Sequence, residues 1–469
     1  MRGGDVLTIE LPSEVAAALA ALDAAGAEAA LVGGCVRDLV RGAVPDDWDV
    51  ATSLRPEAVS GLFPGATWQN RFGTVTVRPD PEAGLVEITT YRVEGAYRDH
   101  RRPDDVQWGG SLAEDLSRRD FTINALAWVP DDLERGTGRL VDPFGGAADL
   151  ADGLLRAVGD ADERFGEDAL RLLRAVRFAT RFELRIDPAT EAAIRRHGRN
   201  ARSLSGERVR DELLRILGGE APPSQALFLM ERVGLLTVVL PELARLRGVP
   251  QAKAIPGDAL DHSLRTADAL PSHDPVLRLA GLLHDLGKAT TLADGHFIGH
   301  EREGAILADA VLRRLRLPRR DAHRVMRLIE HHMFTYSADW TDAAVRRFVR
   351  RTGTELLEDL FALRAADDAA SGAVEPPSGG LSELRERARA AVSGDAMEPH
   401  QLAVDGNDLI QALDLRPGPI VGQLLTRLLE AVIEEPALNR RDHLIALARD
   451  WLATGDRMHH LAERRGGTD

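Results

Sequence analysis

The sequence of 469 residues predicts an α+β protein, in which a small mixed α/β head is followed by all-helical domains. Runs rich in Val, Ile and Thr, which are typical of strands, occur only within roughly the first 130 residues. Beyond about residue 150, apolar side chains recur with helical spacing. Hydrophobic residues make up 44% of the chain and aromatic residues only 4%, as expected for a soluble protein built from Ala- and Leu-rich helices.

The head is expected to begin with a helix over residues 13–25, which stops at Gly26. The apolar run 30–32 predicts a strand, and the pair Gly33-Gly34 then opens a second helix. Alternating or continuous apolar patterns predict further strands at 47–51, 73–78 and 84–92.

The chain is long enough for two to four domains, and the patterns divide it into four parts. The head covers 1–150 and is followed by helical segments at 151–250, 255–370 and 381–469. Residues 370–380 contain Pro, Gly and Ser in a pattern typical of a flexible linker. No apolar run approaches the length of a membrane span, and the single Cys35 excludes a disulfide framework. These features predict a cytoplasmic location and no membrane partner; the oligomeric state stays open.

The net charge of −15 argues at first against a nucleic-acid partner, but the charge is unevenly distributed. Residues 1–150 carry 25 acidic and 14 basic side chains, whereas residues 151–250 carry 15 acidic and 17 basic ones. An RNA-binding surface is therefore expected on the middle segment or on a local patch.

The most informative pattern in the head is a glycine pair followed by two spaced carboxylates. A strand that ends at Gly33 and Gly34 lets the backbone approach a polyphosphate, and Arg37 can add a contact to a phosphate or sugar. If Asp47 and Asp49 lie on a strand, both carboxylates project to the same face. Such a pair suits Mg²⁺, which binds carboxylates together with substrate phosphates. A solvated acidic turn is the alternative.

Five motifs occur in order: GGCVRD (33–38), DWD (47–49), RRDFTINALA (118–127), DPFGG (142–146) and EDALRLLRAVRF (167–178). Together they resemble the bacterial CCA-adding tRNA nucleotidyltransferases and related poly(A) polymerases, over residues ~25 to ~245. The resemblance implies a nucleotidyltransferase head, a helical neck and body, catalytic Mg²⁺ on Asp47 and Asp49, and CTP, ATP and the tRNA 3′ end as partners. The residues it implies for nucleotide contacts are Gly33, Gly34, Arg37 and Arg119, with Asp120 and Asn124 as structural or sugar-contacting neighbours. It also implies Glu87 as a third acidic group that faces the metal ions.

The segment 167–178 suggests how bases are chosen without a template. On a helix, Asp168 and Arg171 share a face, and an acceptor beside a donor matches the Watson–Crick edges of cytosine and adenine but not of uracil or guanine. Arg174 and Arg177 continue the stripe and suit triphosphate contacts. The polar segment 94–106 resembles the flexible loop that family members use when they switch to ATP. Its presence does not separate a CCA-adding enzyme from one that adds only A.

The second helical block contains a set of His and Asp residues that resembles the HD phosphohydrolase superfamily. The resemblance implies metal ligands at His262, His284, Asp285 and Asp367 for an unspecified divalent metal, possible further ligands at His300 and His331, and a phosphate partner in Lys288. We interpret the other histidines of this block, His332 among them, as surface or core residues. Three alternatives to CCA addition remain: A-only addition, poly(A) synthesis, and an HD-type hydrolase whose head serves as a binding module.

Overall fold

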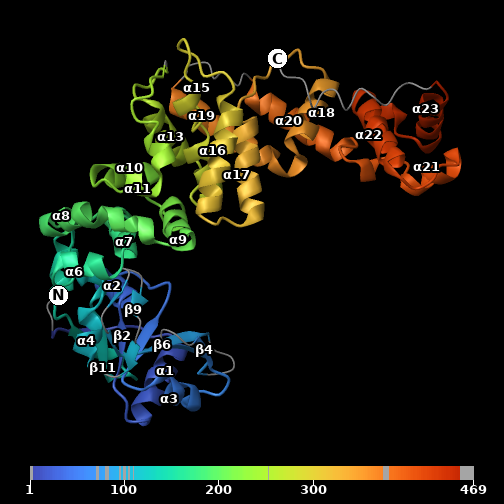
Figure 1. Cartoon of the computed structure of the whole chain (residues 1–469). Coiled ribbons are helices and arrows are strands. Elements are labelled where there is room, and N and C mark those ends of the chain that lie inside the picture. Colours follow the sequence, from blue (N-terminus) through green and yellow to red (C-terminus); the bar gives the residue numbers. More distant parts are fainter. Residues whose placement is uncertain are drawn as a thin grey trace. The chain divides into compact units, whose positions relative to one another are not determined.

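Figure 1 presents the computed structural model, which describes residues 4–69, 73–79, 84–94, 97–98, 102–103, 106–108, 110–251, 253–372 and 380–454. The chain divides into two compact units. The first comprises Met1–Arg245 with Val311–Leu317, and the second comprises Leu246–Ala310 with Pro318–Asp469. The overall α+β class is as predicted. The boundaries of the four expected domains stay a prediction.

The first unit is built on an eight-stranded sheet of order β1-β12-β11-β2-β3-β6-β5-β4. Neighbouring strands are antiparallel except β3 and β6, which run parallel with Asp49 opposite Glu87. The strands are β1 (Val6–Thr8), β2 (Ala29–Val32), β3 (Asp49–Thr52), β4 (Thr67–Gln69), β5 (Thr74–Val77), β6 (Val86–Thr90), β11 (Ala127–Asp132) and β12 (Thr137–Val141). Short pairs join β7 (Arg92–Glu94) to β10 (Val106–Trp108), β8 (Tyr97–Arg98) to β9 (Arg102–Pro103), and β13 (Leu154–Leu155) to β14 (Arg185–Ile186).

The two faces of the sheet have different cores because side chains alternate along a strand. Leu31, Val50 and Ile88 join the core that includes the apolar face of α1 (Ser13–Ala24). Ala30 and Ala51 belong to a second cluster on the opposite face. Asp49 has the same parity as Ala51, so it projects from this second face.

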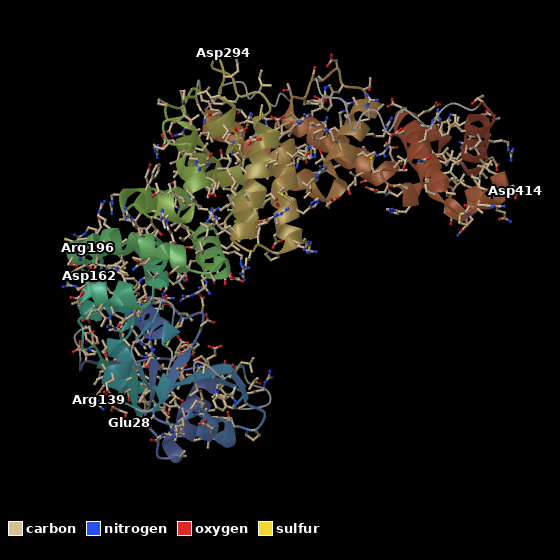
Figure 2. The ribbon with its side chains drawn as sticks, in the orientation of Figure 1. Glu28, Arg139, Asp162, Arg196, Asp294 and Asp414 are labelled. Carbon is tan, nitrogen blue, oxygen red and sulfur yellow. The ribbon has the colours of Figure 1, made fainter. Side chains whose placement is uncertain are left out.

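Helices form most of the rest of the first unit. They are α2 (Gly34–Val40), α3 (Pro56–Leu62), α4 (Leu112–Ser117), α5 (Gly146–Ala151), α6 (Ala161–Glu167), α7 (Leu170–Arg181), α8 (Pro188–His197), α9 (Gly206–Leu217), α10 (Pro223–Arg232), α11 (Leu236–Val239) and α12 (Pro241–Ala244). α7 packs against α9 and α10, and α6 packs against α8. Figure 2 shows Arg196 of α8 beside Asp162 of α6, and their Nη2 and Oδ2 atoms lie 2.6 Å apart.

The regular secondary structure described in the second unit is helical. Its helices are α13 (Ala259–Ala269), α14 (Pro275–Leu283), α15 (Lys288–Thr291), α16 (His300–Arg314, of which Val311–Arg314 belongs to the first unit), α17 (Arg319–His331), α18 (Asp342–Thr352), α19 (Leu357–Ser371), α20 (Leu381–Gly394), α21 (Gly406–Leu413), α22 (Pro419–Glu434) and α23 (Arg441–Ala453). α13, α14, α17 and α19 pack against one another, as Figure 1 shows for α13 and α19. A separate apolar core, with Leu409, Leu428 and Leu444 at its centre, joins α21, α22 and α23.

Most expected elements of the head are present within one or two residues of their predicted bounds. The strand expected at 47–51 begins only at Asp49, so Asp47 lies in the preceding bend. The segment 94–106, expected to lack strands, contributes short strand pairs where it is described, while 95–96, 99–101 and 104–105 lie outside the described residues. The expected linker largely does too, since only 370–372 and 380 are described. Among the described helices, none has the length and apolar character required to cross a bilayer.

Candidate functional site

The carboxylate of Asp49 lies at the start of β3, and Asp47 lies in the bend that precedes this strand. Part of Asp49 is exposed, yet the surrounding protein removes enough water to raise its pKa above the ordinary value. Repulsion from Asp47 raises that pKa further, whereas Arg119 and Arg37 lower it. The two carboxylates are therefore close enough to interact. Glu87 stands in register with Asp49 on β6, which supports its place as a third acidic group.

Gly33 forms the turn between β2 and α2 with a φ of 76°, a conformation that favours glycine. A Cβ atom at this position would lie 2.4 Å from Nη1 of Arg119. That guanidinium is fixed by Asp115, whose Oδ2 accepts a hydrogen bond from Nη2 at 3.1 Å, and by the carbonyl of Asn124 at 3.3 Å. The missing side chain at Gly33 thus allows Arg119 to lie directly against the turn. Asp115 was not identified from the sequence.

A continuous hydrogen-bond chain connects three of the sequence motifs. Nη1 of Arg37 donates to Oδ1 of Asn124 at 2.7 Å, and Nδ2 of Asn124 donates to Oδ1 of Asp120 at 3.0 Å. The other carboxylate oxygen of Asp120 accepts from Nε of Arg174 at 2.7 Å. Arg37 also lies 4.3 Å over the ring of Phe182. The chain links α2 to α7 and fixes both arginines.

The predicted base-reading pair, Asp168 and Arg171, is arranged differently from the expectation. Asp168 precedes α7 and is not helical, with a φ of −139°, so the two residues do not share a helix face. Its Oδ1 accepts from the backbone N–H of Leu170, and its Oδ2 accepts from Arg208 at 2.7 Å. The helix begins later than predicted because Asp168 serves as a capping acceptor.

Arg171 is buried and has three acceptors. Its Nη1 lies 2.5 Å from Oε2 of Glu167 and 3.0 Å from the carbonyl of Arg164, and its Nη2 donates to the carbonyl of Arg118 at 2.7 Å. Both members of the predicted pair therefore lie in one region but have separate partners. A role in reading bases requires that these partners be exchanged.

Arg177, expected to contact a triphosphate, is also buried and paired. Its Nε donates to Oε2 of Glu212 on α9 at 2.6 Å, and its guanidinium lies 4.2 Å from the ring centre of Phe178. Arg177 lines a cavity of about 590 Å³ whose other cationic residues are Arg41, Arg181 and Arg215. Neither Asp47 nor Asp49 lines it. Asp38, Asp46 and Glu220 line the cavity too, so its charge is mixed. The sequence alone did not identify this cavity or Glu212.

Three comparisons place these features among known proteins. Residues 29–156 match the Poly A polymerase head domain, residues 183–246 the probable RNA and SrmB-binding site of polymerase A, and residues 305–448 a putative tRNA nucleotidyltransferase domain 2. The A-adding tRNA nucleotidyltransferase of Deinococcus radiodurans is 37% identical over 86% of this chain and 91% of its own length. The CCA-adding enzyme of Lactiplantibacillus plantarum is 34% identical over 95% and 98%.

The chain belongs to the tRNA nucleotidyltransferase family. Among solved structures, the CCA-adding enzyme of Bacillus stearothermophilus in complex with CTP superposes with a TM-score of 0.68. It is 29% identical and covers 96% of this chain and 99% of the other. The predicted family is thereby confirmed, and the match extends beyond the motifs into the second unit.

The second unit of this tRNA nucleotidyltransferase contains a buried His–Asp cluster. His262 on α13, His284 after α14 and Asp367 on α19 offer ligand atoms within 4.8 Å of one another, as do His284, Asp285 and His332. The Nε2 atom of His262 lies 2.9 Å from Oδ1 of Asp367. The four residues predicted as ligands are therefore brought together by three packed helices. Whether they hold a metal stays a prediction.

Three histidines of the cluster are oriented in the same way. Nδ1 of His284, His300 and His332 each lies within 2.8 Å of the carbonyl oxygen three residues earlier. With Nδ1 as the donor, Nε2 has a free lone pair directed into the cluster, as in many metal sites. The buried Nε2 atoms of His284 and His300 make no hydrogen bond within the described residues. They lie 3.1 Å and 3.4 Å from oxygen atoms of Asp285.

Of the two adjacent histidines, it is His332, interpreted from the sequence as a surface or core residue, that joins the possible ligands, and not His331, the predicted further ligand. His331 lies outside the cluster near Glu330, whereas His332 is buried among the ligands. The helical period explains the difference. Leu328 and Ile329 form the buried face of α17, and His332 follows them by four and three residues. This spacing was readable from the sequence.

Burial and neighbouring charges shift the pKa values of several residues in the His–Asp cluster. Desolvation lowers the pKa of His262 to about 4 and that of His332 to about 3, so both rings are neutral at pH 7. Burial alone would raise the pKa of Asp285, but His284 and Lys288 hold it well below its usual range. Nζ of Lys288 lies 2.6 Å from Oδ2 of Asp285. Lys253, which the sequence analysis did not place, contacts the same cluster.

Proposed function

We propose that this chain adds nucleotides to the 3′ end of tRNA from CTP and ATP without a nucleic-acid template. The observation that carries this proposal is the pair Asp47 and Asp49 beside the Gly33 turn, in a chain whose relatives are CCA-adding and A-adding enzymes. In the reaction, the terminal hydroxyl of the tRNA bonds to the α-phosphorus of the nucleotide, and pyrophosphate leaves.

The donor set around Asp49 fits Mg²⁺. Carboxylate oxygens are the ligands that this ion prefers, and the pKa of Asp49 is raised by burial and, to a smaller extent, by repulsion from Asp47, both of which a bound cation would offset. When bound, Mg²⁺ supplies Lewis-acid activation of the hydroxyl and neutralises charge on the leaving pyrophosphate. Asp47 and Asp49 hold the ion, and Glu87 is in register to assist. Arg37 and Arg119 contribute positive charge toward the triphosphate.

Base choice is assigned to Asp168 and Arg171, after exchange of their present partners for the edge of the incoming base. Arg208 holds Asp168 nearby, at the junction of α6 and α7. A buried acceptor and donor reject the wrong bases strongly, because mismatched polar groups stay unpaired. Asp168→Asn should therefore raise UTP and GTP incorporation relative to CTP and ATP, as measured by primer extension. An unchanged preference would contradict the assignment.

The direct test offers tRNAs that lack CCA, end in C, or end in CC, with one labelled nucleotide at a time. Incorporation of C into the first two tRNAs and of the final A into all three, with the other nucleotide present unlabelled, supports a CCA-adding enzyme. Extension of the CC-ending tRNA alone supports the A-adding alternative, favoured by the 37% identity to the Deinococcus enzyme. Long A tracts on generic RNA would support a poly(A) polymerase. Asp49→Asn should abolish addition, whereas Asp131→Asn, an exposed acid on β11, serves as the matched control.

We further propose that the His–Asp cluster is the metal-binding centre of a phosphohydrolase of the HD type. Supporting observations are the converging Nε2 atoms and their neutral, buried state. Mixed His and carboxylate ligands fit several first-row divalent metals. Hydrolysis of p-nitrophenyl phosphate and of its bis-ester, with Mn²⁺ or with EDTA, tests the activity.

The two proposed sites should be separable. His284→Asn should abolish hydrolysis and leave nucleotide addition intact, and Asp49→Asn should do the reverse. If His284→Asn removed both activities in a folded protein, the division into two sites would be wrong. If the wild-type chain hydrolysed phosphate esters but added no nucleotide to any tRNA, the head would be a binding module, as the third alternative states.

A further inference from the structure

The two lysines of the chain lie at the same cavity. The other 57 of the 59 basic residues are arginine, even in buried ion pairs such as that of Arg177 with Glu212. Lys253 and Lys288 both line a cavity of about 510 Å³ beside the His–Asp cluster. A compact ammonium on a flexible stem differs from a planar guanidinium in that it can change partners with little geometric constraint. Both lysines of the chain therefore lie next to the predicted metal ligands.

Lys253 contacts the ligand atoms themselves. Its Nζ lies 2.8 Å from Nε2 of His262 and 3.2 Å from Oδ1 of Asp367. These two atoms are 2.9 Å apart and belong to the group that can hold a metal. The ammonium therefore contacts the same two atoms that a divalent ion would bind.

A metal and the ammonium cannot share these atoms. A divalent first-row ion sits about 2.1 Å from a histidine nitrogen, which places it next to Nζ, and two like charges at that separation repel strongly. One of the cations must leave. Lys253 is free to do so because it precedes α13 and lies in no helix.

Lys288 is held more firmly. It begins α15, three residues after Asp285, and its Nζ bonds Oδ2 of Asp285 and Oε1 of Gln251 at 3.1 Å. Its side chain is 8% exposed, against 21% for Lys253. Of the two lysines, Lys253 is therefore the one able to exchange partners.

We propose that Lys253 competes with a divalent metal for His262 and Asp367, and that the displaced ammonium binds the anionic group of the substrate in the adjoining cavity. This inference rests on the proposed metal centre and deepens it. Arg364 and Lys288 bring positive charge to the cavity, which Asp285, Asp367 and Asp368 also line, and Phe297, Ile298 and Met333 form an apolar wall. That lining fits a phosphate ester with an apolar or aromatic substituent.

Metal binding tests the competition directly. The full chain carrying Asp47→Asn and Asp49→Asn, which lacks the head site, is titrated with Mn²⁺ by calorimetry. Adding Lys253→Met should tighten the Mn²⁺ dissociation constant by about tenfold or more, because a competing unit charge is removed. Lys253→Gln provides a second neutral variant. Arg385→Met, which removes the same charge from an exposed pair with Glu358, should leave the constant unchanged.

Inorganic phosphate tests the second half of the inference. With Mn²⁺ saturating, Lys253→Met should weaken phosphate binding by about tenfold, while Arg385→Met should not. Equal or weaker Mn²⁺ binding in both Lys253 variants would overturn the competition, and unchanged phosphate binding would overturn the substrate role. Failure of every variant, the parent included, to bind Mn²⁺ would instead overturn the metal centre on which the inference rests.

Discussion

At Gly33 two separate constraints act on a single residue. The φ of 76° disfavours any side chain, and Arg119 occupies the space that a Cβ would need. Gly42 has a similar φ of 74°, but a Cβ added there would have no atom within 4 Å. A side chain at Gly42 would therefore cause backbone strain only, whereas a side chain at Gly33 would cause backbone strain and a clash with Arg119.

We predict that Gly33→Ala lowers nucleotide addition on the order of 100-fold, because displacement of Arg119 misplaces a group beside the proposed metal site. Gly42→Ala should cost only the left-handed strain, about 1 kcal/mol of unfolding free energy, and leave addition near the wild-type rate. Primer-extension rates and chemical denaturation measure the two effects. Equal losses of activity in both variants would contradict this account of Arg119.

The lowered pKa values of His262 and His332 make stability depend on pH. In the unfolded chain both rings take a proton below about pH 6.5, whereas the folded state resists protonation until about pH 4 and pH 3. The unfolded state thus binds more protons in this window, so stability must fall as the pH falls.

We predict that, with chelator present, the unfolding free energy of the second unit drops between pH 6.5 and pH 4. The expected slope is about 1.4 kcal/mol per pH unit for each histidine. His332→Gln should remove one histidine's share of that slope. Thermal unfolding across this range measures it, and a wild-type curve as flat as the variant's would refute the prediction.

Helix α7 illustrates how one element connects the head to the helices behind it. In its N-terminal half, Arg174 donates a hydrogen bond to Asp120 of the head. In its C-terminal half, Arg177 donates a hydrogen bond to Glu212 of α9. Glu212 is 1% exposed and is contacted by two arginines, of which Arg215 is 62% exposed. The position of α7 therefore depends on buried ion pairs as well as on apolar packing.

Glu212→Gln should destabilise the first unit by about 3 kcal/mol, since it leaves Arg177 as an uncompensated buried charge. Arg215→Gln is the matched control, because an exposed partner contributes under about 1 kcal/mol. Urea denaturation of both variants measures the difference. Similar midpoints for the two would show that the α7–α9 ion pair contributes little.

At the scale of the whole molecule, the candidate sites lie in different compact units. The carboxylates of Asp47 and Asp49 belong to the first unit, and the His–Asp cluster belongs entirely to the second. Each unit has its own apolar cores and its own buried polar network. Separate cores permit separate unfolding.

We therefore expect two calorimetric transitions. In the Asp47→Asn, Asp49→Asn chain, Mn²⁺ should raise only the transition of the second unit, by about 2.7 kcal/mol at a hundredfold excess over its dissociation constant. Fluorescence from a single tryptophan retained in the first unit should report the other transition unchanged. One merged transition that shifts as a whole would contradict independent units.

The sequence by itself determined the α+β class, four of the eight strands of the main sheet of the head (β2, β3, β5 and β6), its first two helices, and the family. Those features depend on local signals: the period of apolar residues, glycine turns and motifs with fixed spacing. The membership of the His–Asp cluster was mostly readable too, and the helical period would also have favoured His332 over His331. The local sequence pattern was sufficient to predict features that depend on residues close together in the chain.

Only the tertiary structure decided which side chains pair across long distances. The capping role of Asp168 and its bond to Arg208, the burial of Arg177 on Glu212, and the approach of Lys253 to His262 each join segments far apart or alter a helix end. Hydrogen bonds and charge pairs act over a few ångströms in space, whatever the separation in sequence. For that reason the partners of a charged residue follow from the packing of the elements.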